Sequence, residues 1–219
     1  MEDSRYRRQR LLVQLIQEII SKIKTMSIVS GQSRSDHILH MRMEATRFQS
    51  FVYFDSSFTI TGRKIVPQEL PLFGGFYEMN GNYYILSGQT NKNESDSVEV
   101  YRITKYTKDW NLVASCGLYG ENTTVPFDAG SARMAAYGDY LMIRTSHEMY
   151  KSKKDGYNHQ ANVTIQVDTS AMKVTDSYTK VMNVSFGYVS HSFNQFIQME
   201  NGKIVRLIME MHIRDLSFW

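Results

Sequence analysis

The sequence predicts an all-β fold, and three observations support that prediction. Short runs rich in β-branched and aromatic residues alternate with polar or glycine-containing turns over most of the 219 residues. A turn followed by a large apolar residue recurs three times, and so does a hairpin turn containing glycine that leads into an apolar strand. Together they predict a four-stranded unit repeated about three times, a partial β-propeller-like repeat.

The first repeated feature is a strand, a turn of small or charged residues, and a second strand that resumes with a large apolar residue. The large residues are Phe58, Trp110 and Met172, which recur after roughly 50 to 60 residues. That interval is typical of a four-stranded propeller blade. We therefore expect the three turns to occupy equivalent places in three sheets.

The second repeated feature is a hairpin turn around Gly81, Gly138 and Gly202. Two of these turns contain Asn-Gly, which is a strong hairpin signal because both residues tolerate a positive φ. Each turn leads into an apolar strand. The spacing of these glycines again follows the proposed unit, which supports the repeat.

Two polar loops differ in length, residues 87–97 in one unit and 145–159 in the next. Such insertions lie on one rim of a repeat structure, often its binding rim. The alternative is a β-sandwich, whose hairpins resemble one another because they share turn chemistry. Closed propellers need roughly four to eight blades. We therefore expect an incomplete array, or one that self-associates through open sheet edges.

The two ends of the chain depart from this pattern. We expect residues 1–40 to hold an N-terminal amphipathic helix and, from about residue 27 to 41, a polar linker. Residues 41–206 are the expected repeats, and 207–219 an atypical tail. We hypothesise that this tail is read out of frame, because one permitted codon choice encodes a different peptide in another phase. The helix is predicted by apolar residues at helical spacing: Leu12, Leu15, Ile16, Ile19, Ile20 and Ile23.

Composition excludes several classes of protein. The net charge is +3, with 25 basic and 22 acidic residues interspersed, so no basic stripe for nucleic acid is expected. The single cysteine, Cys116, excludes an intramolecular disulfide and is expected to be a small buried residue. No apolar run approaches the roughly 18 residues of a membrane span, so we expect no transmembrane segment.

Five motifs in the repeat region are more specific than composition. They read FGGF at 73–76, TTVPFDAG at 123–130, RTSHEMY at 144–150, NHQAN at 158–162 and YVSHSFNQF at 188–196. These motifs resemble those of uncharacterised, secreted, β-propeller-like repeat proteins of Gram-positive gut bacteria. The resemblance covers roughly residues 41–206.

That resemblance implies a secreted or cell-surface protein, but the family has no established activity to transfer. In the family, a His-Gly-Asp-Ala-Tyr-Pro-Arg-like stretch tends to follow the last motif. The out-of-frame reading of residues 208–215 is similar to that stretch. The chain departs from the family's pattern at both ends, where neither a signal peptide nor the later repeats are found.

Polar residues that could recognise a ligand gather in the expected rim loops. Three histidines there could ligate zinc or another divalent metal, or one beside a carboxylate could act as a general base. Their spacing matches no compact metal motif, so no metal, cofactor or catalytic residue is assigned. The expected ligand-binding residues are Asp128, Arg133, His147, Glu148, Asn158, His159, Gln160, His191 and Asn194.

Residues 91–96 carry oxygen-bearing side chains in a pattern similar to a calcium loop, but they lack its sixth-position glycine and closing glutamate. The function expected from all of this is a non-catalytic extracellular or cell-surface binding or adhesion module. It would be a fragment of a longer propeller-like protein and would recognise a glycan or a protein. The alternative is an enzyme fragment with a histidine-based metal or acid–base site in the propeller channel.

Overall fold

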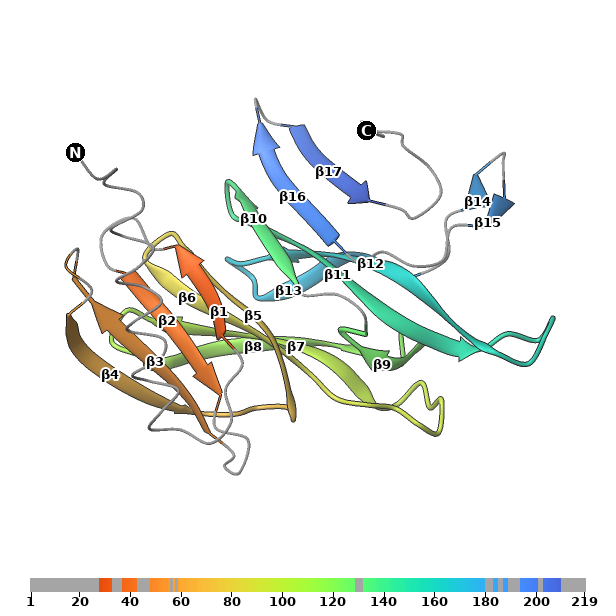
Figure 1. Ribbon diagram of the computed structural model, residues 1–219, viewed down its shortest axis with the longest axis horizontal. Coiled ribbons are helices and arrows are strands. Elements are labelled where there is room, and N and C mark those ends of the chain that lie inside the picture. Colours follow the sequence, from red (N-terminus) through yellow and green to blue (C-terminus); the bar gives the residue numbers. More distant parts are fainter. Residues whose placement is uncertain are drawn as a thin grey trace, which may run out of the picture. The chain divides into compact units, whose positions relative to one another are not determined.

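The prediction of an all-β protein is confirmed by the computed structural model. The described part of the chain contains strands β1 to β17 and no helix, and therefore no helix that could cross a membrane (Figure 1). The predicted N-terminal amphipathic helix lies outside the described residues. The structure describes residues 28–32, 37–42, 48–55, 57, 59–128, 132–179, 183–184, 187–188, 194–200 and 203–209.

The chain divides into two compact units, Met1–Glu69 and Leu70–Trp219. The first unit contains one antiparallel sheet in which neighbours in sequence are neighbours in space. Phe51, in the third strand of this sheet, is fully buried. The strands are β1 (Ile28–Gln32), β2 (His37–Arg42), β3 (Phe48–Phe54) and β4 (Ile60–Pro67).

The linker predicted between residues 27 and 41 is wrong, because β1 and β2 occupy it. Strand β2 pairs along its whole length with β3, from His37 opposite Phe54 to Arg42 opposite Gln49. A short, mixed stretch can become a strand when an apolar neighbour offers it a hydrogen-bonding edge, because β-propensity depends strongly on context. The tail boundary also differs, since β17 continues to Met209.

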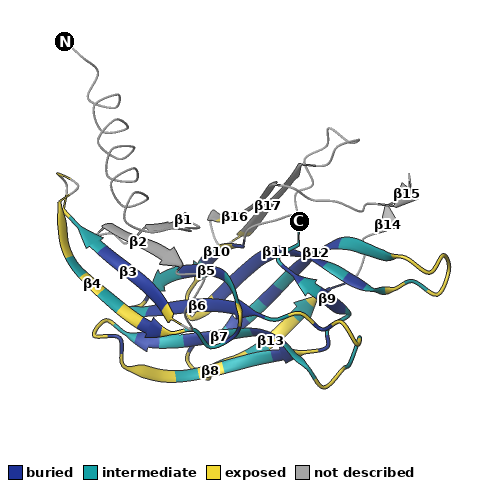
Figure 2. Ribbon diagram, turned by 60° about the horizontal axis from the view of Figure 1, so that its bottom comes forward, coloured by how far each residue is buried: buried dark blue, intermediate teal, exposed yellow. Residues whose placement is uncertain are grey.

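The second unit begins with a four-stranded antiparallel meander that repeats the topology of the first sheet. Its second and third strands are largely buried, whereas its fourth strand is mostly exposed or partly exposed, as the colours in Figure 2 show. The strands are β5 (Leu72–Met79), β6 (Asn82–Gly88), β7 (Glu99–Thr107) and β8 (Leu112–Tyr119).

A third meander follows, with one additional short strand. Strand β9 (Thr123–Pro126) pairs with the long second strand of this sheet. The four meander strands are β10 (Arg133–Tyr137), β11 (Tyr140–Lys151), β12 (Asn158–Asp168) and β13 (Lys173–Tyr178). Two hairpins come after it, β14 (Asn183–Val184) with β15 (Gly187–Tyr188) and β16 (Asn194–Glu200) with β17 (Lys203–Met209).

The repeated turns occupy equivalent places in the two meanders of the second unit, as predicted. Gly81 (φ 70°) and Gly138 (φ 56°) each lie between the first and second strands of their sheet. Trp110 (φ 63°) and Met172 (φ 48°) each lie between the third and fourth strands. Phe58 and Gly202, the remaining members of these two sets, lie outside the described residues.

Equivalent parts of the two meanders also meet one another. The first strands, β5 and β10, are in contact, and so are the fourth strands, β8 and β13. At the hairpin turns, Asn80 Nδ2 donates to the Gly138 carbonyl oxygen at 3.2 Å. The two sheets therefore stack in the same orientation, with like parts adjacent.

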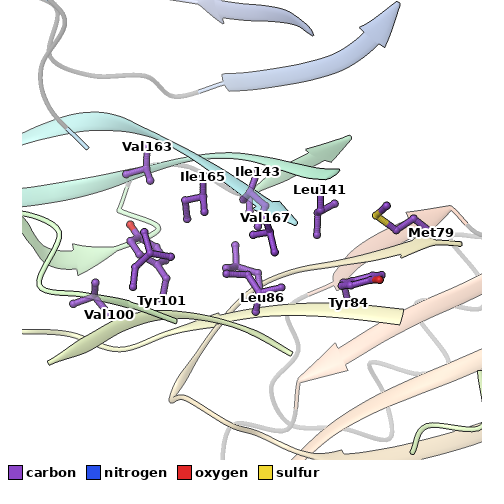
Figure 3. Packing of buried hydrophobic residues seen from close by; sticks show 13 residues of the cluster. Met79, Tyr84, Leu86, Val100, Tyr101, Leu141, Ile143, Val163, Ile165 and Val167 are labelled. Carbon is purple, nitrogen blue, oxygen red and sulfur yellow. The ribbon is translucent and has the colours of Figure 1, made fainter. Parts of the chain in front are cut away.

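Buried apolar side chains from both meanders form the core between these two sheets. Leu86 and Tyr101 point from one sheet toward Ile143 and Ile165 of the other (Figure 3), and all four are almost completely buried. Burial of this apolar area is the main force that holds the two sheets together.

The FGGF motif is explained by the packing of one aromatic ring. A β-carbon added at Gly74 would collide with the ring of Phe127, and one at Gly88 would lie 2.8 Å from it. Phe127, which has a positive φ of 63°, also packs edge-on against Tyr101. The glycines therefore make room for a ring that joins the end of β9 to the β5–β7 strands.

Candidate functional site

The two polar loops predicted to share a rim do meet. The loop between β6 and β7 supplies Glu94, whose Oε1 accepts hydrogen bonds from the Lys151 backbone N–H at 2.9 Å and Asn158 Nδ2 at 3.1 Å. The same loop supplies Asn91, whose Nδ2 donates to the Tyr150 hydroxyl at 2.9 Å. These bonds join the β6–β7 loop to the β11–β12 hairpin.

Asn91 organises the β6–β7 loop from inside. Its side chain is buried, and its Oδ1 accepts from the Ser95 N–H at 3.0 Å while its Nδ2 reaches the Ser95 carbonyl at 2.9 Å. Its backbone N–H donates to the Thr124 carbonyl in β9 at 2.8 Å. A buried amide with this many partners fixes the loop, because losing any partner would leave a desolvated polar group.

Between these loops lies an open pocket of about 480 Å³. That volume is within the range of small-molecule sites in proteins. Charged side chains of both signs, amides and a hydroxyl line it. The lining residues are Lys92, Asn93, Glu94, Thr124, Val125, Glu148, Lys151 and Asn158.

Glu148 is one of the two carboxyl groups that line this pocket. It lies on β11 opposite Gln160 of β12. Partial burial raises its pKa above the ordinary value, and the negative charges of Asp128 and Glu94 raise it further. The nearby charges of Asp128 and Glu94 therefore favour a proton or another cation at the Glu148 carboxyl.

Asp128 stands next to this wall and is held there by the β-sheet. Gln160 Nε2 donates to Asp128 Oδ2, and Ser146 Oγ donates to the Asp128 carbonyl oxygen. Ser146, Glu148 and Gln160 share one face of the β11–β12 pair because side chains alternate along a strand. The structure therefore brings together four of the predicted binding residues, Asp128, Glu148, Asn158 and Gln160.

His147 does not join them. It is fully buried on the opposite face of β11, where Nδ1 lies 2.7 Å from Thr123 Oγ1. Burial lowers the pKa of His147 to about 4, although a hydrogen bond with the backbone of Thr179 opposes that shift. The ring is thus a neutral, structural part of the core at neutral pH and is not a pocket ligand.

Two further predicted site residues, His159 and Arg133, do not line the pocket. His159 Nε2 pairs with Asp155 Oδ2 at 2.9 Å within the β11–β12 hairpin. Arg133 is exposed at the start of β10. His191 lies outside the described residues, and Asn194 begins β16 with a side chain that is not described.

The histidine-based site is therefore not assembled from His147 and His159. No group of three or more His, Cys, Asp or Glu side chains suited to a metal ion occurs in the part of the chain that the structure describes. The oxygens of the calcium-like stretch serve other contacts, since Glu94 binds the β11–β12 hairpin and Asp96 Oδ1 accepts from the Tyr150 hydroxyl at 3.2 Å.

Cys116 is partly buried in β8 and packs against the core cluster. Burial raises the pKa of its thiol to about 11, and the charge of Glu99 adds to the effect. The thiol is therefore protonated at neutral pH and is a poor nucleophile, which agrees with a packing role.

Six residues of the pocket lining are not among the ligand-binding residues expected from the sequence: Lys92, Asn93, Glu94, Thr124, Val125 and Lys151. Val125 and Thr124 belong to β9, whose pairing with β11 joins segments more than 20 residues apart. Lys92 and Lys151 could have been predicted from one feature of the sequence, namely that they lie in the polar loops 87–97 and 145–159.

Comparisons with known proteins give only distant structural likenesses. No family model matches the sequence, and no curated protein matches it. A mutant of the apocarotenoid oxygenase of Synechocystis is similar over 81% of this chain and 47% of its own, with 8% identity and a TM-score of 0.45. AztD of Citrobacter koseri is similar over 83% of this chain and 65% of its own, with 10% identity and a TM-score of 0.30.

The chain spans less than two thirds of the length of either structure. Likenesses at this level of identity and TM-score transfer no activity, ligand or metal to this chain. The site has to be interpreted from its own residues.

Proposed function

We propose that the chain is a non-catalytic, extracellular or cell-surface binding module built from β-propeller-like sheets. In this proposal the meanders are blades, and the loops that join the second to the third strand of each blade carry the ligand. The ligand is a small polar molecule or the polar end of a glycan.

The stacking of like parts supports the propeller-like arrangement. In the second unit, first strand meets first strand, fourth meets fourth, and equivalent hairpin turns are hydrogen-bonded through Asn80 and Gly138. A sandwich of two unrelated sheets does not require such equivalence, whereas successive blades do.

The observation that carries the binding function is the pocket between the two fixed loops. Its lining presents the donors and acceptors that polyhydroxylated ligands need, on loops already held in place by Asn91 and Glu94. Preorganised loops bind more tightly because little conformational entropy remains to be lost on binding.

Calorimetric titration of the full chain with a panel of neutral, cationic and anionic monosaccharides tests this function. Lys151→Ala should weaken the binding of the sugar that wild type prefers, because Lys151 lines the pocket. Lys154→Ala is the matched control, since Lys154 is an exposed lysine of the same hairpin outside the lining. If no sugar binds to the folded protein, or if both variants weaken binding equally, the proposed site is wrong.

A second candidate is acid–base catalysis at Glu148, favoured by one observation. Its raised pKa in a pocket beside Asp128 resembles the paired carboxylates of glycoside hydrolysis, in which one carboxyl stays protonated as the acid. Chromogenic glycosides distinguish the two functions. Turnover that is lost in Glu148→Gln, with binding retained, would favour the enzyme over the binding module.

A further inference from the structure

The pocket contains charges of both signs that are not neutralised by one another. The carboxyl of Glu148 and the ammonium groups of Lys92 and Lys151 all border it. Among the described residues none of these three groups forms an ion pair, and none has a side-chain hydrogen bond. The pocket therefore keeps a cation-binding carboxyl and two anion-binding ammonium groups available to a ligand.

The neighbouring carboxylates are already engaged, which makes Glu148 different from them. Asp128 accepts from Gln160, and Glu94 accepts from Asn158 and the Lys151 backbone. Both still contribute negative charge at Glu148. A ligand ammonium placed at Glu148 would be attracted by all three carboxylates while displacing no existing hydrogen bond.

A β-bulge places Lys151 on the same face of β11 as Glu148, and both side chains line the pocket. The register of β11 with β12 shifts between these two residues, so that Glu148 opposes Gln160 and Lys151 opposes Asn158. A bulge of this kind re-aims the side chains that follow it. Lys92 comes from the β6–β7 loop, on a different part of the pocket lining.

We propose that the ligand of this pocket is a zwitterionic amino sugar. Its ammonium group would bind the Glu148 carboxylate, its anionic group would bind Lys151 and Lys92, and its hydroxyls would bind Asn93. This inference rests on the proposed binding function and specifies the chemical class of its ligand. Charge-assisted hydrogen bonds are shorter and stronger than neutral ones, so the two charges would dominate selectivity.

Four sugars that share one glucose ring and differ in their substituents at C2 and C3 test the inference on the wild-type full chain. Muramic acid carries an amine and a carboxylate, N-acetylmuramic acid only the carboxylate, glucosamine only the amine, and glucose neither. Calorimetric titration at neutral pH should rank muramic acid first and glucose last. Each charged group is expected to change the dissociation constant by about tenfold.

Two variants then assign each charge to a residue. Glu148→Gln should remove the preference for an amine and keep the preference for a carboxylate, whereas Lys151→Ala should do the reverse. Lys154→Ala should leave the ranking unchanged. The comparison of the four sugars on wild type still decides the matter if a variant fails to fold.

The outcomes separate this inference from the function on which it rests. If glucose binds as tightly as muramic acid, or if Glu148→Gln leaves the amine preference intact, the zwitterion is wrong while a sugar-binding pocket stands. If none of the sugars in this series or in the wider panel binds, both proposals fail.

Discussion

The two ends of the strands in the second unit show how one repeated scaffold supports two different tasks. At one end, tight turns at Gly81, Trp110, Gly138 and Met172 join successive strands. At the other end, the β6–β7 loop and the β11–β12 hairpin are longer and polar, and they enclose the pocket. The strands between them are paired in the same way throughout.

The end with the short turns is stabilised by apolar packing. Trp110 is almost fully buried although it lies in a turn, with ring centroids 4.6 Å from Tyr83, 6.1 Å from Phe76 and 5.8 Å from Tyr106. Its left-handed backbone conformation costs about 1–2 kcal/mol, which the aromatic contacts offset. At the pocket end, the buried amide of Asn91 and the partly buried carboxylate of Glu94 hold the loops instead. Apolar contacts therefore stabilise the repeat, whereas polar contacts shape its site.

If this division is correct, the largest loss of stability should come from Trp110. Trp110→Ala is expected to lower the free energy of unfolding by about 3–5 kcal/mol, because it removes an aromatic cluster and keeps the unfavourable φ. Urea denaturation measures the loss. The exposed Leu112 in the same hairpin is the control, and Leu112→Ala should change stability by less than about 0.5 kcal/mol. Equal effects would contradict the packing role of the turn.

The next effect depends on pH and concerns His147. Its pKa is lowered to about 4 in the folded protein, from 6.5 in the unfolded chain, so the unfolded state binds the extra proton more readily. The stability contributed by neutral His147 is complete above pH 6.5 and is lost as the pH falls toward 4. His147→Gln should flatten the stability profile over that interval in denaturation measured at several pH values. An unchanged slope would show that other groups cause the acid sensitivity.

A smaller loss is expected where the pocket end joins the core. Gly74→Ala would force the Phe127 ring to move, and overpacking of this kind costs about 1–3 kcal/mol. Gly62→Ala is the control, because a β-carbon there would meet only ordinary contact with Tyr53 at 3.7 Å. Thermal unfolding compares the two. A Gly74→Ala protein as stable as wild type would mean that the ring has room to shift.

The smallest effect is expected at the pocket itself. The raised pKa of Glu148 means that its carboxylate is less favourable in the folded than in the unfolded chain, and this cost is present once the pH exceeds the folded pKa. Glu148→Gln should therefore leave stability unchanged or slightly higher at neutral pH, and at pH 4 the difference should vanish. A marked loss of stability at neutral pH would show that the carboxylate has a structural partner.

Much of the scaffold could be predicted because its turns are local chemistry. The predicted repeat assigned equivalent turns to Gly81 and Gly138 and to Trp110 and Met172. The structure has these residues in those turns. The strands β1 and β2 were missed, because their residues form strands only when β3 pairs with them. The N-terminal helix stays a prediction.

The site could be predicted only in part. Alternation along β11 separates His147 from Glu148, although both were expected to bind the ligand. Glu148, Asn158, Asp128 and Gln160 are brought together as expected, whereas Lys92 and Thr124 join them through contacts distant in sequence.

Local patterning alone therefore specified the all-β class, the unit of repetition and the two loops that form a rim, because turn preferences and strand composition act over a few residues. The pairing of β9 with β11, the burial of His147 and the gathering of Glu148, Lys92 and Lys151 around one pocket were decided by folding. Those features depend on which distant segments become neighbours and on how far each group is removed from water. A short stretch of chain determines neither its distant neighbours nor its depth of burial.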